Sequence, residues 1–201
     1  VVEGPMARRV ADLRAAFEAM AGPTWRDPWT VPAPLRGPEP AKPVRVALVA
    51  DPGSQGTAKQ VQAGVRKAAT ALEDAGYAVD EVEPPSIGVA ARTWLDILTP
   101  DWRAGLQMWG ADTTPPWGAD TNRFVSAILE VAPDPDSLTT IQSFMVRQSL
   151  LRTWGEFEEE HPLIVAPIFT DVPFEEGKDL TTTGVAEILR GMRMVLAVSA
   201  L

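Results

Sequence analysis

The chain has 201 residues, of which 45% are hydrophobic and 22% charged, and its formal net charge is -9 at pH 7. This composition is typical of a globular protein, and the length allows one large domain or a domain with attachments. The negative charge argues against a nucleic-acid partner, which would need a basic surface. No apolar run reaches the length of a transmembrane helix, so we expect no membrane partner.

Cysteine is absent from the chain, and histidine occurs once, at His161. Without cysteine the chain has no disulfide, no thiolate metal site and no cysteine nucleophile. A single histidine also excludes a metal site with several histidine ligands. We therefore expect no cofactor. The lack of cysteine fits a cytoplasmic protein, which is the location that we expect.

An apolar stripe marks the first predicted helix, which follows Gly4-Pro5. Its members recur at helical spacings of 4, 3, 4 and 3 residues, and they are Met6, Val10, Leu13, Phe17 and Met20. Such a stripe needs a partner to pack against, and the apolar run MVLAVSAL ends the sequence without a cap. We therefore expect the chain to be truncated at both ends, with exposed apolar ends that favour self-association.

The next segments predict a strand–helix–strand unit. Residues 23–43 contain seven prolines and are expected to form an extended connection. The run VRVALVAD at 44–51 predicts a strand buried on both faces, and YAVDEVEPP at 77–85 predicts a second, parallel strand. Between them a helix is expected over 58–75. Its predicted inward positions are Val61, Val65, Ala68 and Leu72.

The rest of the chain predicts further helices and one more strand. Residues 94–135 are expected to be an irregular, Trp-rich segment that begins as a helix. A long helix is predicted over 137–161, capped by Asp136 or Ser137, and PLIVAPIF at 162–169 predicts a buried strand. The expected inward positions of the long helix are Ile141, Met145, Leu151, Trp154 and Phe157. A last helix is predicted through Val185 and Met192. The fold class is therefore α/β, a mixed sheet covered by helices.

Two features could carry chemistry, and each has a structural alternative. The stretch VALVADPGSQGTAKQ places Gly53 and Gly56 between a strand and a helix, where a phosphate could bind the helix N-terminus. It lacks the spacing of the known phosphate loops, so we favour an ordinary turn. His161 follows three glutamates at the end of the long helix. No GxSxG motif accompanies it, so we favour a structural role over that of a general base.

The Trp-rich segment is the least usual feature of the sequence. Four of the seven tryptophans fall within 24 residues, and they are Trp94, Trp102, Trp109 and Trp117. They either pack in a core or line an apolar pocket on loops. The residues by themselves reveal no catalytic machinery. A non-enzymatic αβ module that binds a partner through this segment is therefore one interpretation of the sequence.

The opening stretch GPMARRVADLRAAFEAMAG resembles a segment of the amidase signature family, hydrolases that cleave carbon–nitrogen amide bonds. The similarity continues in order through residues 45–51, VQAGVRKAATALEDAGYAVDEVEPP, HPLIVAPIFTDVPF and MVLAVSAL. It covers nearly the whole chain and is weakest at 99–135. It implies a partial amidase-signature fold, in which residues 1–201 are a single portion of a larger amidase domain.

The resemblance also implies which residues act. Family members use a serine nucleophile, a second serine on a cis peptide bond, a lysine base and a Gly- and Ser-rich loop that stabilises the oxyanion. No lysine or serine of this chain matches those contexts, so we assign no catalytic residue and expect the chain alone to be inactive. It would supply scaffold and one wall of the cleft for a small-molecule amide substrate. The expected substrate-binding residues are Trp94, Trp102, Trp109, Trp117, Pro167, Ile168 and Phe169.

Overall fold

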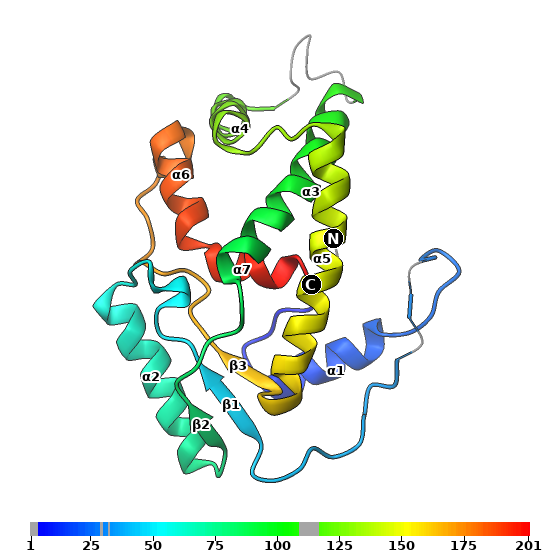
Figure 1. Cartoon of the computed structure of the whole chain (residues 1–201), viewed down its shortest axis with the longest axis vertical. Coiled ribbons are helices and arrows are strands. Elements are labelled where there is room, and N and C mark those ends of the chain that lie inside the picture. Colours follow the sequence, from blue (N-terminus) through cyan, green and yellow to red (C-terminus); the bar gives the residue numbers. More distant parts are fainter. Residues whose placement is uncertain (1–3, 29, 32, 109–116) are drawn as a thin grey trace. The chain divides into compact units, whose positions relative to one another are not determined.

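The computed structural model describes residues 4–28, 30–31, 33–108 and 117–201 (Figure 1). The chain divides into two compact units, Val1–Ala41 and Lys42–Leu201. The described residues of the first unit include one helix, α1 (Val10–Met20), with no buried residue. The five residues of the predicted apolar stripe are between 37% and 97% exposed. The predicted helix is thus confirmed, but it begins at Val10, so Met6 of the stripe precedes it.

A three-stranded parallel sheet forms the base of the second unit. The strands are β1 (Arg45–Leu48), β2 (Ala78–Asp80) and β3 (Leu163–Val165), and their order in the sheet is β2-β1-β3. The α/β class and the parallel pairing of β1 with β2 are confirmed. Both strand pairs of the described sheet are parallel, so it lacks the antiparallel pairing of the mixed sheet that we expected.

Helix α2 (Lys59–Asp74) covers one face of this sheet. Alternation along the strands points Leu48, Val79 and Val165 toward the helix. These side chains pack against Val65 and Ala69 of α2. The inward position is therefore Ala69 and not Ala68, because the buried stripe runs at a spacing of four residues here.

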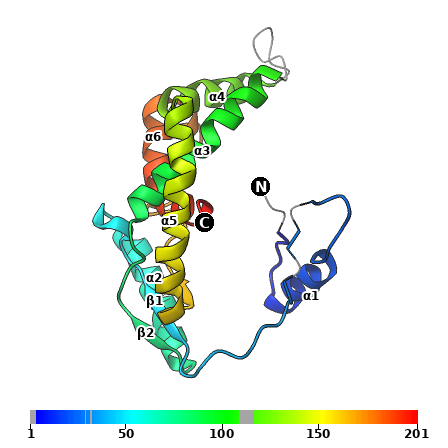
Figure 2. The same cartoon turned by 45° about the vertical axis from the view of Figure 1, so that its right-hand side comes forward.

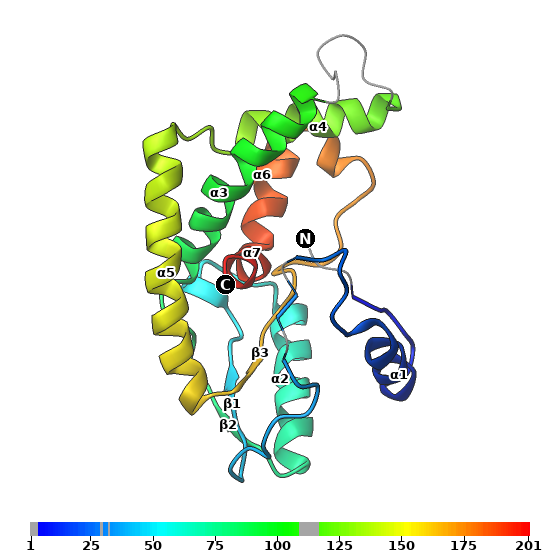
Figure 3. The same cartoon turned by 90° about the vertical axis from the view of Figure 1, so that its right-hand side faces the viewer.

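The opposite face of the sheet carries the larger core. Val49 and Ile164 pack there with residues of α3 (Ile87–Met108), α5 (Ser137–Glu160) and α7 (Arg193–Ser199). Figure 3 shows the strands between α2 on one side and α5 on the other. The fully buried Trp154 anchors this core, and its indole N–H donates to the carbonyl oxygen of Pro85 at 2.9 Å.

The described part of the Trp-rich segment is far more helical than the sequence predicts. Helix α3 continues through Pro100 to Met108, and α4 (Ala119–Val131) follows. Burial of Thr93, Asp96, Thr99 and Leu106 holds α3 together on both sides of the proline. Tertiary packing thus overrides the local tendency of proline to end a helix. Figures 1 and 2 show α4 across the end of the unit that is distant from the sheet.

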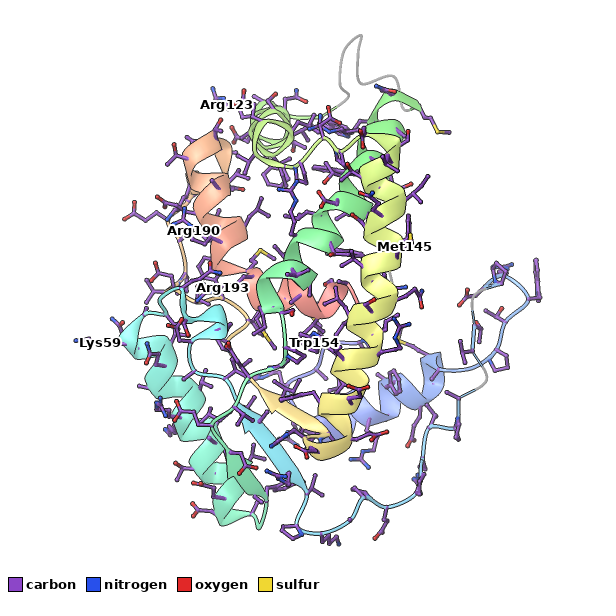
Figure 4. The ribbon with its side chains drawn as sticks, viewed as in Figure 1. Lys59, Arg123, Met145, Trp154, Arg190 and Arg193 are labelled. Carbon is purple, nitrogen blue, oxygen red and sulfur yellow. The ribbon has the colours of Figure 1, made fainter. Side chains whose placement is uncertain are left out.

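Helix α5 begins as predicted, but it faces the core with other residues. The Asp136 carboxylate accepts the N–H of Thr139 at 2.7 Å, which confirms it as the cap. Ile141 and Met145 are 60% and 68% exposed, against 1% for Trp154. Figure 4 shows Met145 directed away from α3. The buried side chains Ser143, Leu150 and Trp154 follow a stripe on the other side of the helix, at spacings of about seven and four residues.

The end of the chain forms two short helices, α6 (Thr182–Gly191) and α7 (Arg193–Ser199), which meet at Met192. The sequence predicts one helix and an exposed apolar tail. Instead Met194, Leu196, Ala197 and Ala200 are buried in the larger core, because α7 turns back over the sheet. Two 3-10 turns, Pro52–Ser54 and Lys178–Leu180, complete the described elements. No helix among them combines the length and apolar character that crossing a bilayer requires.

At Gly184, helix α6 packs closely on the 3-10 turn Lys178–Leu180. A Cβ atom at Gly184 would lie 1.8 Å from the backbone carbonyl oxygen of Lys178. We expect Gly184→Ala to lower the free energy of unfolding by about 3 kcal/mol, because backbone must move to admit the methyl group. The control is Gly155→Ala in α5, where an added Cβ atom would meet no atom of another element within 4 Å. That change should raise the free energy by up to about 1 kcal/mol. Denaturant titration measures both, and equal stability of the two variants would contradict this packing.

Candidate functional site

A buried guanidinium joins the segments that follow β1 and β3. Arg193 is 5% exposed and lies where these segments meet the end of α6 (Figure 4). Its Nη2 donates to Asp51 Oδ1 at 2.9 Å and to the Gly56 carbonyl at 3.0 Å, and its Nη1 donates to Thr170 Oγ1 at 2.9 Å. Its Nε donates to the carbonyl of Pro52. Burial lowers the pKa of Arg193, and the Asp51 carboxylate opposes that shift.

The loop after β1 is an ordinary strand-to-helix turn. Two of the N–H groups that a phosphate would need are already bound to carboxylates. Gly53 donates to Glu83 Oε2 at 2.9 Å, and Gly56 donates to Asp51 Oδ2 at 3.1 Å. Lys59 extends away from the loop (Figure 4). The carboxylates of Asp51 and Glu83 and the guanidinium of Arg193 therefore already bind the polar groups of the loop, which favours the structural interpretation over a nucleotide site.

His161 also has structural surroundings. It is 4% exposed, its ring stacks on Phe157 with centroids 5.1 Å apart, and its Nε2 lies 3.2 Å from Asp80 Oδ2. The same Asp80 oxygen accepts from Arg45 at 3.0 Å. The Arg45 guanidinium lowers the pKa of Asp80, and His161 adds to that shift. His161 thus ties the end of α5 to β2, which favours the structural interpretation.

Two of the predicted substrate-binding residues line one apolar cavity of about 430 Å³. Pro167 is buried there, whereas Ile168 is 78% exposed. The rest of the lining is mostly apolar and comes from the ends of α5, β3 and α7, including Trp154, Leu163, Ile164, Met194, Val195, Val198 and Leu201. A cavity with these walls accepts an apolar group and supplies little to bind a charge.

Phe169 lines a different cavity from Ile168. It lines a polar cavity of about 360 Å³ with Arg190 and the ion pair of Lys178 and Glu187. Its ring lies against Gly191, where a Cβ atom would come within 2.3 Å of the ring. The alternation of side chains along the loop therefore separates Phe169 from Ile168, and the structure does not bring the two into one cavity.

The three described tryptophans of the Trp-rich segment are spread over α3 and the residues just before α4. Trp94 is half-buried and packs against the larger core. Trp102 is half-buried on α3, and Trp117 lines a third cavity, of about 560 Å³, between α3 and α4. Trp109 lies outside the described residues. Because α3 is a continuous helix, Trp94 and Trp102 lie eight residues apart along it, about 12 Å, and are not gathered on a loop.

Sequence reasoning missed the residues that organise this part of the molecule. Arg193 was not singled out, since a lone arginine in an apolar run has no motif. Asp51 and Thr170, which bind it, are 142 and 23 residues away. The available signal was a charged residue within MRMVLAVSAL, because a cation among apolar residues of a helix has to find a buried partner.

Comparison with known proteins gives a family match and two curated relatives. The profile of the family described as Amidase matches residues 1–195. An indoleacetamide hydrolase of Bradyrhizobium diazoefficiens is 34% identical over 201 residues, which cover 99% of this chain and 38% of that protein. An indoleacetamide hydrolase of Bradyrhizobium japonicum is 36% identical over 207 residues, with 99% and 43% covered. The chain thus spans about two fifths of the length of these relatives.

The Arg193 contacts predict a large loss of stability when the guanidinium is removed. Arg193→Met should lower the free energy of unfolding by about 3 kcal/mol, because it removes the cationic partner of Asp51 and the donor to the carbonyl oxygens of Pro52 and Gly56. Arg190→Met is the control, since Arg190 is exposed one turn earlier. It should change the free energy by less than about 0.5 kcal/mol. Denaturant titration at neutral pH compares them, and a stable Arg193→Met protein would show that the contacts are dispensable.

The Asp80 contacts predict acid sensitivity. The pKa of Asp80 in the folded protein lies below its ordinary value of 3.8. The contribution of the ionised Asp80 carboxylate to the free energy of unfolding is therefore complete above pH 3.8. It is lost as the pH falls through the lowered pKa. Asp80→Asn should therefore flatten the decline of unfolding free energy below about pH 4. Asp74→Asn, exposed at the end of α2, is the control. Parallel pH profiles for Asp80→Asn and the unchanged protein would contradict the assignment.

Proposed function

Since the chain belongs to the amidase family, we propose that the intact protein hydrolyses a carbon–nitrogen amide bond of a small molecule. The observation that carries this proposal is the match of the Amidase family to residues 1–195. The serine nucleophile, the second serine and the lysine base are expected outside residues 1–201. Within the chain we assign no catalytic residue, and the isolated chain is predicted to be inactive.

The role that we propose for this chain is to supply scaffold and one wall of the substrate cleft. The Arg193 contacts support it, because they fix the segment that carries Pro167 and Ile168. The family match and the relatives do not favour the alternative of a non-enzymatic binding module. A cytoplasmic location and self-association through the exposed stripe of α1 stay predictions.

The substrate class that we propose is an amide with an aromatic acyl group. Two relatives are named for indoleacetamide, whose indole ring is large and apolar. The apolar cavity of about 430 Å³ at Pro167 and Ile168 has walls of matching chemistry. Burying an aromatic ring against such walls contributes on the order of 2 kcal/mol, which ranks substrates. Trp94, Trp102, Trp109, Trp117 and Phe169 stay predicted substrate-binding residues, with less support than Ile168.

The test is a kinetic comparison in the full-length enzyme. Ile168→Ala should raise KM for indoleacetamide on the order of tenfold and raise KM for acetamide far less, because acetamide has no ring to lose contact. The control is Val89→Ala, since Val89 is a half-exposed residue of α3. It should leave both constants unchanged. An equal rise of KM for both substrates would show that Ile168 does not line the substrate pocket. A full-length enzyme that hydrolyses no amide would overturn the proposed function.

A further inference from the structure

The loop that follows β3 is fixed at both of its ends. At its start, the carbonyl oxygen of Val165 accepts the N–H of Val49 at 2.9 Å. At its end, the N–H of Thr170 donates to the carbonyl of Gly191 at 3.0 Å. The Thr170 carbonyl accepts the N–H of Ala58, the residue before α2, at 2.8 Å. The intervening residues, 166–169, therefore span two points that the rest of the unit holds in place.

The side chain of Thr170 adds a third contact at the second point. Thr170 is 5% exposed, and its Oγ1 accepts from Nη1 of Arg193 at 2.9 Å. Arg193 is itself held by Asp51 and by backbone carbonyls. The hydroxyl thus connects the loop to a buried ionic contact that has little freedom to move.

The residues between these points differ sharply in exposure. Pro167 is buried with its backbone φ restricted by its ring, and the Phe169 ring packs against Gly191 and meets Phe174 edge to face, with centroids 5.9 Å apart. Ile168, between them, is 78% exposed. A large apolar side chain is therefore presented outward by a backbone that is fixed on both sides.

From these contacts we propose that Thr170 is a positioning residue that sets substrate selectivity through Ile168. A wall on a fixed loop gives its full contact energy to a ligand, whereas a loose wall has to be ordered first. Thr170 does not touch the substrate. Its hydroxyl keeps the loop in the position at which Ile168 meets an aromatic acyl group. The inference rests on the proposed amidase activity and adds a residue outside the cavity to it.

The test compares Thr170→Val with Thr170→Ser in the full-length enzyme. Valine keeps the shape of threonine but removes the acceptor for Arg193, whereas serine retains the acceptor. The measured quantity is the ratio of kcat/KM for indoleacetamide to kcat/KM for acetamide. We expect Thr170→Val to lower this ratio on the order of tenfold and Thr170→Ser to retain it. If the valine variant does not fold, Thr170→Ala against Thr170→Ser gives the same comparison.

A double-mutant cycle with Ile168→Ala separates positioning from general support of the fold. If Thr170 acts through Ile168, Thr170→Val should not change the ratio further when Ile168 is already alanine. An equal drop in both backgrounds would overturn the inference while leaving the amidase activity established. A full-length enzyme that hydrolyses neither amide would instead overturn the proposed function, and the inference with it.

Discussion

The buried guanidinium of Arg193 is the constraint on which the arrangement of the loops in the second unit depends. Three segments that are distant in the sequence converge on it: the loop after β1, the end of the loop after β3, and the junction of α6 with α7. A buried charge is costly unless its hydrogen-bonding capacity is filled, and here Asp51, Thr170 and backbone carbonyls fill it. Since few alternative arrangements could satisfy all these donors together, the contact specifies one arrangement of the loops.

Each face of the sheet packs in a separate hydrophobic core. The face toward α2 carries a small core built from Leu48, Val65 and Val165, which fixes the strand–helix–strand unit locally. The other face carries the larger core, in which Trp154 fills the space between α5, the sheet and α7. That core holds α7 in place, and α7 in turn presents Arg193 to the loops. Apolar packing therefore supports the polar contact, and the polar contact selects the loop positions.

The two cavities beside the loop after β3 differ in polarity. The loop after β3 presents an apolar surface at Ile168 beside a cavity of about 430 Å³, while polar groups of Lys178, Glu187 and Arg190 lie around the neighbouring Phe169. One loop thus separates an apolar from a polar surface by the alternation of its side chains. This arrangement supports the proposal that the loop is a cleft wall that contacts an apolar part of a substrate.

The sequence by itself determined the α/β class, the amidase resemblance, the parallel strand–helix–strand unit and the Asp136 cap. Each of these depends on local periodicity, on caps or on ordered similarity, which neighbouring residues encode. The tertiary structure alone decided that α3 continues through Pro100, that Ile141 and Met145 face away from the core, and that Ile168 and Phe169 line different cavities. It also decided that Arg193 is buried beside Asp51, 142 positions earlier. Contacts across such separations leave no periodic trace, because they depend on how whole elements pack and not on the spacing within any one of them.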